Sequence, residues 1–363
     1  MNNCPICLSH TETIFKLQDF PILISSFPEN FKLKNIILLD DLYIEKCSNC
    51  GFVSNRKQKT DFYKNLYTNT PKFQSKKNHL HWKNIFYKFK PNNILEICVG
   101  INNIGSILEE KTNLSVLDYS IEDEQLKLNK TNIKFIKEEI KEHLNDFSGD
   151  VYDAVFMSHV CEHIPDISNF FDLLLKSEAC KNAKLFIEIP SFSFYAKYAP
   201  YYLFNFEHCT HLNTHYLKVI MKRYHYKLTE YFSIGKNRNS LCYVFEKGKD
   251  LDLGMIEEEY STSQIIFDFE RSIKEMTSSI DKLLRSFDKK VALKKGSGGA
   301  ANLFMYYLKK ESLEFSKLIP TDNIRIGNIM SSTKQKILSD QSFENFIELN
   351  PDSPNGYISG LRI

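Results

Sequence analysis

Short apolar segments alternate with helix-length amphipathic segments through the middle of the chain. Five of them follow one another after residue 92: NILEICV, LSVLDY, IKFIKE, YDAVFMS and AKLFIEIP. Strands buried on both faces have such nearly continuous apolar runs, and their alternation with helices is typical of a parallel sheet covered on both sides. Two later segments, KLTEYFSIG and SLCYVFEK, are separated by a short polar connection and predict an antiparallel pair at the sheet edge. The pattern therefore predicts an α/β fold.

The patterns on either side of this region differ from it and predict further domains. The N-terminal part shows little helical periodicity, and the polar segment 60–79, interrupted by Pro71, predicts a linker. Apolar residues at helical spacing from Met255 to Leu284 predict one long helix that bridges two domains. The following VALKKGSGGAANLFMYYLKK predicts strand, glycine loop and helix. We expect an N-terminal domain at residues 1–61, a core domain at 76–247, a bridging helix at 252–288 and a C-terminal α/β domain at 289–363.

Length and composition narrow the classes of protein that fit. A chain of 363 residues exceeds one ordinary domain, and no apolar stretch approaches the roughly 18 residues that span a bilayer. Lys and Arg total 47 against 45 Asp and Glu, and the net charge of +2 supplies no field for generic nucleic-acid binding. The start MNNCPICLSH lacks the features of a signal peptide, so we expect a cytoplasmic protein with reduced cysteines. We expect neither a nucleic acid nor a membrane as partner.

Two CxxC pairs in the N-terminal part predict a metal site. Cys4 and Cys7 form the first pair, and Cys47 and Cys50 form the second. Four sulfurs at this doubled spacing can converge tetrahedrally on zinc, and four cysteine ligands leave no open position, so the role would be structural. The alternative is a set of incidental buried cysteines. The long insert between the pairs predicts a hairpin or loop of its own.

Acidic residues and a glycine loop follow the first two predicted strands in an arrangement that suits a nucleoside cofactor. Glu96 ends the first strand, Gly100 lies in the loop after it, and Asp118 ends the second strand. A carboxylate at that point can accept both ribose hydroxyls of a nucleoside that lies across the glycine loop. Ordinary strand ends also carry aspartate, so these residues alone leave a cofactor site and a plain buried strand both open.

The ends of the third and fourth strands extend this arrangement. They carry Glu138 and Glu139, which could meet an adenine amino group, and Ser158 and His159. The segment SHVCEHIPD after the fourth strand resembles class I S-adenosylmethionine-dependent methyltransferases. The resemblance implies a Rossmann-like core that binds S-adenosylmethionine. The first loop departs from that family's E-x-G-x-G-x-G, because Cys98 and Asn102 replace two glycines, and asparagine tolerates an unusual backbone angle better than most residues.

The order of motifs over nearly the whole chain resembles the three-domain sugar C-methyltransferases. The resemblance rests on the two CxxC pairs with FPILISS between them, FEHCTHLNTHYL, IGKNRNSLCYVF, KKGSGGAANLFMYYL and IPTDNIRIGNIMSSTKQKILS. It implies a zinc-binding N-terminal domain, a methyltransferase core and a C-terminal Rossmann-like domain. It also implies a nucleotide-diphosphate keto-sugar as substrate, destined for a surface polysaccharide or a secondary metabolite.

The same resemblance implies catalytic residues. The family's catalytic Glu-His pair corresponds to Glu207 and His208, and its tyrosine that closes over the cofactor resembles Tyr67. Carbon methylation requires removal of a hydrogen beside a ketone and stabilisation of the enolate, and a histidine with a fixed tautomer is a suitable base. The alternative is that His208 is an ordinary core or surface histidine without a catalytic role, like His211 and His215 in the same segment.

Two competing interpretations remain open at this point. Asn205 stands where the family has a tyrosine, and the missing phenol would suit a relative that methylates oxygen or nitrogen of a surface-glycan precursor. The altered glycine loop would suit a cofactor-free pseudo-methyltransferase that serves as a binding or assembly protein.

Overall fold

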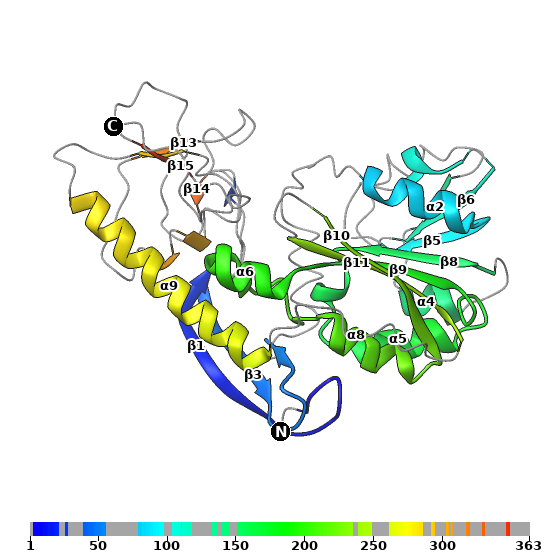
Figure 1. Cartoon of the computed structure of the whole chain (residues 1–363), viewed down its shortest axis with the longest axis horizontal. Coiled ribbons are helices and arrows are strands. Elements are labelled where there is room, and N and C mark those ends of the chain that lie inside the picture. The colour runs from blue at the N-terminus through cyan, green and yellow to red at the C-terminus, as the bar shows by residue number, and fades with distance from the viewer. Residues whose placement is uncertain are drawn as a thin grey trace.

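A seven-stranded sheet forms the centre of the chain (Figure 1). The computed structural model describes residues 3–21, 26–27, 39–55, 79–97, 104–109, 111–117, 133–136, 140–145, 151–234, 239–248, 261–285, 292–294, 303–304, 306–307, 317–319, 329–330 and 346–348. The strands of the large sheet are β5 (Asn93–Ile97), β6 (Asn113–Leu117), β7 (Ile133–Ile136), β8 (Ala154–Ser158), β9 (Lys184–Pro190), β10 (Tyr226–Ile234) and β11 (Ser240–Lys247). Each corresponds to one of the predicted apolar segments.

The strand order of this sheet is β10-β11-β9-β8-β5-β6-β7. The five strands from β5 to β9 run parallel, while β11 is antiparallel to both of its neighbours, β9 and β10. The predicted antiparallel pair is thus confirmed, with β11 inserted between β9 and the edge strand β10. The chain runs from β5 outward to β7 and then returns to β8 on the other side of β5. Parallel sheets bind ligands at the carboxyl ends of the strands beside such a reversal.

Both faces of the sheet are covered by helices, as the continuous apolar runs predict. The covering helices are η1 (Leu80–Trp82) and α2 (Lys83–Phe89) on one face, and α4 (Ile140–Asn145), α5 (Ile167–Lys176) and α8 (Thr214–Lys222) on the other. Successive side chains of a strand point to opposite faces. Accordingly, Ile94 of β5 belongs to the same apolar cluster as Trp82, whereas its neighbour Leu95 belongs to the cluster of Phe171 on α5.

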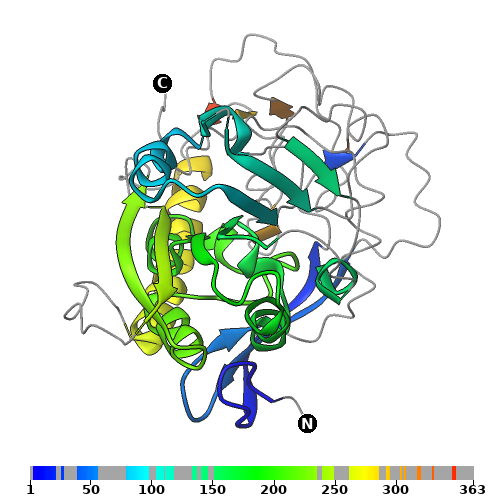
Figure 2. The same cartoon turned by 90° about the vertical axis from the view of Figure 1, so that its right-hand side faces the viewer.

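The N-terminal part forms the hairpin predicted for the insert between the cysteine pairs. Strand β1 (Thr11–Pro21) pairs antiparallel with β3 (Leu39–Cys47), and the short β4 (Val53–Ser54) continues the sheet beyond β3. In both views the N-terminus lies at the lower edge of the molecule, close to the blue hairpin (Figures 1 and 2).

The predicted bridging helix is α9 (Thr262–Arg285), and residues 252–260 of that prediction lie outside the described part of the chain. It runs beside α6 (Phe192–Tyr198), α7 (Pro200–Leu203) and β1 (Figure 1). Among the described residues, no helix is both long enough and apolar enough to cross a membrane. Beyond α9, β12 (Ala292–Lys294) pairs in parallel with β13 (Lys317–Ile319) and β15 (Phe346–Glu348), as expected for an α/β unit, while β14 (Ile329–Met330) pairs with β2 (Ser26–Phe27). The exact domain boundaries stay a prediction.

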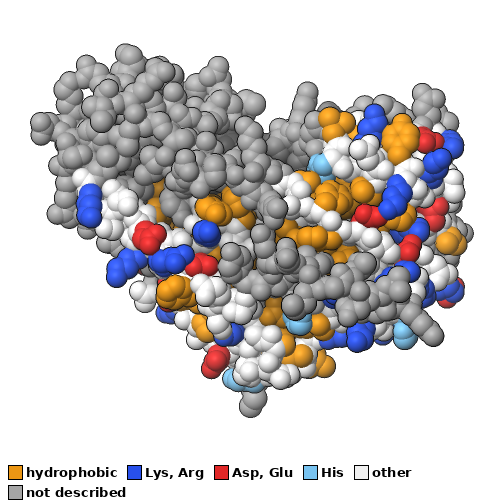
Figure 3. Space-filling view, viewed as in Figure 1, with side chains coloured by type: hydrophobic (Ala, Val, Ile, Leu, Met, Phe, Trp, Pro, Cys, Tyr) orange, Lys and Arg blue, Asp and Glu red, His pale blue; other side chains and the backbone are white. Residues whose placement is uncertain are grey.

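Charged side chains are mixed by sign on the face shown in Figure 3. Lys and Arg are interspersed with Asp and Glu over the described part of that face. This agrees with the near-neutral net charge of +2.

Replacing Phe204 by alanine tests the apolar cluster that joins β1, α6 and α9. Phe204 is fully buried, and its ring meets Phe269 edge-on at a centroid distance of 4.8 Å. Phe204→Ala should cost about 3–5 kcal/mol of unfolding free energy, because it removes a large side chain and leaves a cavity. The matched control is Phe267→Ala on α9, whose side chain is 55% exposed and should cost less than about 1 kcal/mol. Urea denaturation measures both, and equal midpoints would contradict the assigned core.

Candidate functional site

A buried carboxylate, Glu188, organises the carboxyl ends of β8 and β9. Its Oε2 accepts hydrogen bonds from Trp82 Nε1 at 3.0 Å and Ser158 Oγ at 3.0 Å, and lies 3.1 Å from His81 Nε2. Its Oε1 lies 3.1 Å from Nε2 of His159. Burial alone would raise the pKa of Glu188, but the hydrogen bonds of His159, His81 and Trp82, together with the charge of His159, outweigh it and hold the pKa well below its usual range. Glu188 is therefore an ionised group inside the protein.

The ring of His159 connects this carboxylate to a second one. Its Nδ1 lies 3.1 Å from Oε1 of Glu162, so both ring nitrogens face a carboxylate oxygen. The backbone of His159 has a φ of 54°, which is uncommon for a residue other than glycine, and its N–H donates to the carbonyl of Glu188 at 2.9 Å. Burial raises the pKa of Glu162, but the hydrogen bond and charge of His159, together with the charges of His163 and His208, lower it to about 2. The sharp turn after β8 thus places Glu162 as a second buried negative charge.

Two histidines lie beside Glu162. His163 follows it in the short helix η3 (Cys161–His163), and His208 comes from the segment between α7 and α8. The ring centroids of His163 and His208 are 5.0 Å apart in an edge-on arrangement, and Tyr202 meets His208 edge-on at 5.8 Å. Nδ1 of His163 lies 2.8 Å from the carbonyl oxygen of Glu207. The predicted Glu207-His208 pair therefore joins the SHVCEHIPD segment in one site.

The local fold of residues 205–211 explains how His208 is held. The side-chain oxygen of Asn205 accepts the backbone N–H groups of Glu207 at 3.0 Å and His208 at 2.9 Å. Asparagine commonly closes turns in this way. Asn205 is fully buried and serves the backbone, so it does not present its side chain in place of the family's tyrosine.

Backbone hydrogen bonds attach this segment to the rest of the site on two sides. The N–H of Thr210 donates to the carbonyl of Glu162 at 3.1 Å, and the N–H of His211 donates to the carbonyl of Val53 at 3.2 Å. The first bond fixes the segment against η3, and the second fixes it against the N-terminal strand β4.

His208 borders a pocket. The pocket is lined by Glu162, Ile189, Pro190, Phe192, Tyr195, Tyr202, Leu203, His208, Thr210, His211 and Leu212. His211 thus lines the same pocket, whereas His215 is exposed on α8. Sequence reasoning did not assign Glu162 and His163 a role in this pocket. The Glu-His pair inside SHVCEHIPD could have indicated both residues. From that segment, however, the resemblance implied only a cofactor-binding domain.

Burial affects the two predicted catalytic residues in opposite directions. Burial, followed by the charge of His163, lowers the pKa of His208 to about 3, so its ring is neutral at pH 7 and can accept a proton. The charge of Glu162 acts in the other direction and favours the protonated ring. Burial raises the pKa of Glu207 to about 7.

The predicted cofactor residues are only partly within the described chain. Glu96 is buried, and its Oε2 accepts the N–H of Ile104 at 3.0 Å, so it connects the end of β5 to residue 104. Ser158 and His159 lie at the carboxyl end of β8 and bind Glu188 as described above. Gly100, Asn102, Asp118, Glu138, Glu139 and the catalytic candidate Tyr67 lie outside the described residues. The cofactor contacts of all these residues stay a prediction.

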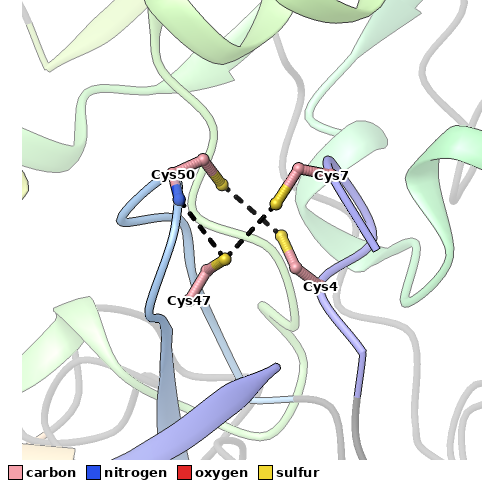
Figure 4. Close-up of side chains that lie close together, drawn as sticks. All are labelled: Cys4, Cys7, Cys47 and Cys50. Carbon is pink, nitrogen blue, oxygen red and sulfur yellow. Dashed lines mark hydrogen bonds between the residues drawn. The ribbon is translucent and has the colours of Figure 1, made fainter. Parts of the chain in front are cut away.

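The four N-terminal cysteines converge as their spacing predicts (Figure 4). The sulfurs of Cys4 and Cys50 are 3.6 Å apart, and those of Cys7 and Cys47 are 3.4 Å apart. Two sulfurs on one tetrahedral zinc ion at bond lengths of about 2.3 Å lie about 3.8 Å apart. The N–H of Ile6 donates to Cys4 Sγ at 3.3 Å, which suits a thiolate. This donor set therefore fits a closed tetrahedral metal site.

Residues 74–231 match the family model of a methyltransferase domain. The chain carries a methyltransferase domain. This finding, together with the strand order of the sheet, confirms the predicted class I, Rossmann-like methyltransferase core and the predicted enzyme class. No curated protein sequence matches the chain.

Solved methyltransferases are similar to this domain at low sequence identity. An S-adenosylmethionine-dependent methyltransferase from Archaeoglobus fulgidus is 15% identical, with 52% of this chain and all of that chain covered at a TM-score of 0.35. The 1,6-didemethyltoxoflavin-N1-methyltransferase of Burkholderia thailandensis is 9% identical, with 56% of this chain and 98% of that chain covered at a TM-score of 0.40. The magnesium protoporphyrin IX methyltransferase of Synechocystis PCC 6803 is 10% identical, with 47% of this chain and 76% of that chain covered at a TM-score of 0.34.

Replacing Glu188 by glutamine tests the buried hydrogen-bond network. An amide offers one acceptor oxygen and directs an N–H₂ group toward donors, so Glu188→Gln should cost about 3–5 kcal/mol of unfolding free energy. The matched control is Glu178→Gln, which removes an exposed ion pair with Lys181 and should cost less than about 1 kcal/mol. Urea denaturation followed by circular dichroism measures both variants. Similar stability of the two variants would show that Glu188 does not hold the site together.

Proposed function

We propose that this protein transfers a methyl group from S-adenosylmethionine to a carbon atom of a nucleotide-diphosphate keto-sugar. The observation that carries the proposal is the position of His208 beside Glu162 at the wall of the pocket, with a donor atom of each within 4.8 Å of the other. Such a pair can accept a proton from carbon and stabilise the positive charge that then develops on the imidazole.

The proposed reaction begins when His208 removes the hydrogen next to the sugar ketone. The electron pair of the C–H bond passes into the enolate, and the imidazolium is stabilised by the charge of Glu162. S-adenosylmethionine, when bound, supplies an electrophilic methyl group. The enolate carbon forms the new C–C bond in line with the breaking S–CH₃ bond, and S-adenosylhomocysteine leaves. Alignment of the two reactants would be the largest contribution of the protein.

The pocket lining supports a sugar as the substrate. Tyr195, Tyr202 and Phe192 offer apolar ring surfaces, and Thr210 and His211 add polar groups. Pockets that combine ring surfaces with a few polar groups bind and orient small molecules. Tyr202, which lies beside His208, offers a phenol for the enolate oxygen in place of the one that Asn205 lacks.

The main competing function is methylation of oxygen or nitrogen on a surface-glycan precursor. It is favoured by Asn205, which replaces the family's tyrosine and supplies no phenol for an enolate. The side-chain oxygen of Asn205 instead accepts the backbone N–H groups of Glu207 and His208. A heteroatom already carries a lone pair and needs less help from a base.

We also propose that the four N-terminal cysteines hold one structural zinc ion. Metal analysis of purified protein should give one tightly bound zinc per chain. Cys47→Ser should unfold the N-terminal hairpin, because the binding energy of a closed site is also folding energy. The control is Cys180→Ser, a buried cysteine outside the cluster, which should keep the zinc. Far less than one equivalent in the wild type, without prior chelation, would refute the proposal.

Replacing His208 by asparagine tests the proposed carbon methylation. His208→Asn should bind S-adenosylmethionine as tightly as the wild type, because the imidazole is not needed for binding. Turnover should fall at least about a hundredfold, which is the usual effect of a positioned base. S-adenosylhomocysteine production from a nucleotide-linked keto-sugar measures turnover, and calorimetry measures binding. His215→Asn, an exposed histidine on α8, should retain full turnover.

Exchange of the sugar hydrogen in deuterated water separates the two kinds of methylation. Without methyl donor, the wild type should exchange the hydrogen beside the ketone, and His208→Asn should not. Methylation that persists in His208→Asn while exchange is absent from the wild type would refute the carbanion mechanism. Methylation of oxygen or nitrogen would then be the better interpretation.

A further inference from the structure

We propose that Glu162, His163 and His208 form a second metal site, for a divalent first-row transition-metal ion. One donor atom of each residue lies within 4.8 Å of the donor atoms of the other two. Ligands of an ion at bond lengths of about 2.1 Å lie roughly 3.0–3.4 Å apart, so small side-chain rotations bring the three donors into range. This site borders the substrate pocket and is separate from the four cysteines.

The hydrogen bond of His163 prepares its ring to bind a metal. Nδ1 of His163 lies 2.8 Å from the carbonyl oxygen of Glu207. A carbonyl oxygen can only accept, so Nδ1 carries the hydrogen, and it is Nε2 whose lone pair a metal ion would take. Metal-binding histidines almost always donate their other ring N–H to a carbonyl or carboxylate in this way.

Glu162 supplies a second and independent observation. The residue is only 3% exposed, and its Oε1 is held by His159. Its Oε2 is buried and has no hydrogen-bond partner among the described residues. A buried carboxylate oxygen without a partner is costly, and a bound cation would satisfy it.

A second group of possible metal ligands in the described chain has no carboxylate oxygen without a partner. His79, His81 and Glu188 also lie close together. The oxygens of Glu188, however, are already engaged by Trp82, Ser158, His81 and His159. The unpartnered oxygen therefore distinguishes the Glu162 group as the site for an ion.

The donor set indicates the class of metal. Two imidazoles and one carboxylate suit first-row ions such as Zn²⁺, Co²⁺ or Fe²⁺, whereas Mg²⁺ and Ca²⁺ prefer oxygen ligands alone. Three protein ligands would leave coordination positions open for water or another ligand. A bound ion would take the lone pair with which His208 accepts a proton, so metal binding and the proposed methylation would compete for the same side chain.

Titration with Co²⁺ tests the site. Protein expressed with added zinc is titrated by calorimetry and by visible absorption. One equivalent of Co²⁺ should bind with the weak bands of nitrogen and oxygen ligands, without the intense thiolate charge-transfer band. Glu162→Gln, His163→Gln and His208→Asn should each bind Co²⁺ about a hundredfold more weakly, and the rise in melting temperature caused by Co²⁺ should disappear.

His215→Asn serves as the matched control and should bind Co²⁺ like the wild type. Zinc content and melting temperature without Co²⁺ show whether each variant is folded, and at least two of the three variants are expected to pass. No binding to the wild type, a thiolate band, or unchanged affinity in the folded variants would overturn the proposal. Binding is measured without enzymatic activity, so failure of this site and failure of the proposed methylation are distinguishable.

Discussion

The position of His208 depends on a short stretch of backbone that is hydrogen-bonded from two directions. The N–H of Thr210 donates to the carbonyl of Glu162 at 3.1 Å, and the N–H of Asn55 donates to the carbonyl of Cys209 at 3.0 Å. These bonds join segments that are far apart in the sequence. Buried backbone groups must be paired, so the same bonds that satisfy the peptide groups also bring His208 beside Glu162. The pocket therefore forms only when η3, the segment that carries His208 and the chain around Asn55 are packed together.

This dependence gives the N-terminal cysteines a role beyond their own hairpin. Cys47 ends β3, and the chain then passes through Cys50 directly into β4, which bonds to the segment that carries His208. The phenol of Tyr216 on α8 also donates to the carbonyl of Cys50 at 3.0 Å. A metal ion that fixes the four sulfurs would hold β4 in register with the pocket. A structural site in one part of the chain would thus support the geometry of another.

Buried charge is the main cost of this arrangement. A carboxylate in a protein interior is destabilising by several kcal/mol unless it is paired and hydrogen-bonded. The ring of His159 contacts both Glu162 and Glu188, and His81, Trp82 and Ser158 also bind Glu188. Such a network holds its members in one geometry, which favours catalysis because the charges need not reorganise during the reaction. The network leaves Oε2 of Glu162 without a hydrogen-bond partner among the described residues, and Glu162 lines the pocket.

The strands of the central sheet, the cysteine cluster and the methyltransferase class could be predicted from the sequence, because they depend on local patterns. Apolar runs predicted all seven strands, the doubled CxxC spacing predicted four converging sulfurs, and SHVCEHIPD with the Glu207-His208 pair indicated a methyltransferase. Tertiary structure alone decided that β11 enters between β9 and β10, that Asn205 closes a turn, and that Glu162 and His163 meet His208. The pairing of β11 with β9 and the meeting of Glu162 and His163 with His208 join residues more than forty positions apart. Only the burial of shared apolar faces and the pairing of buried backbone groups determine which of the many possible partners meet.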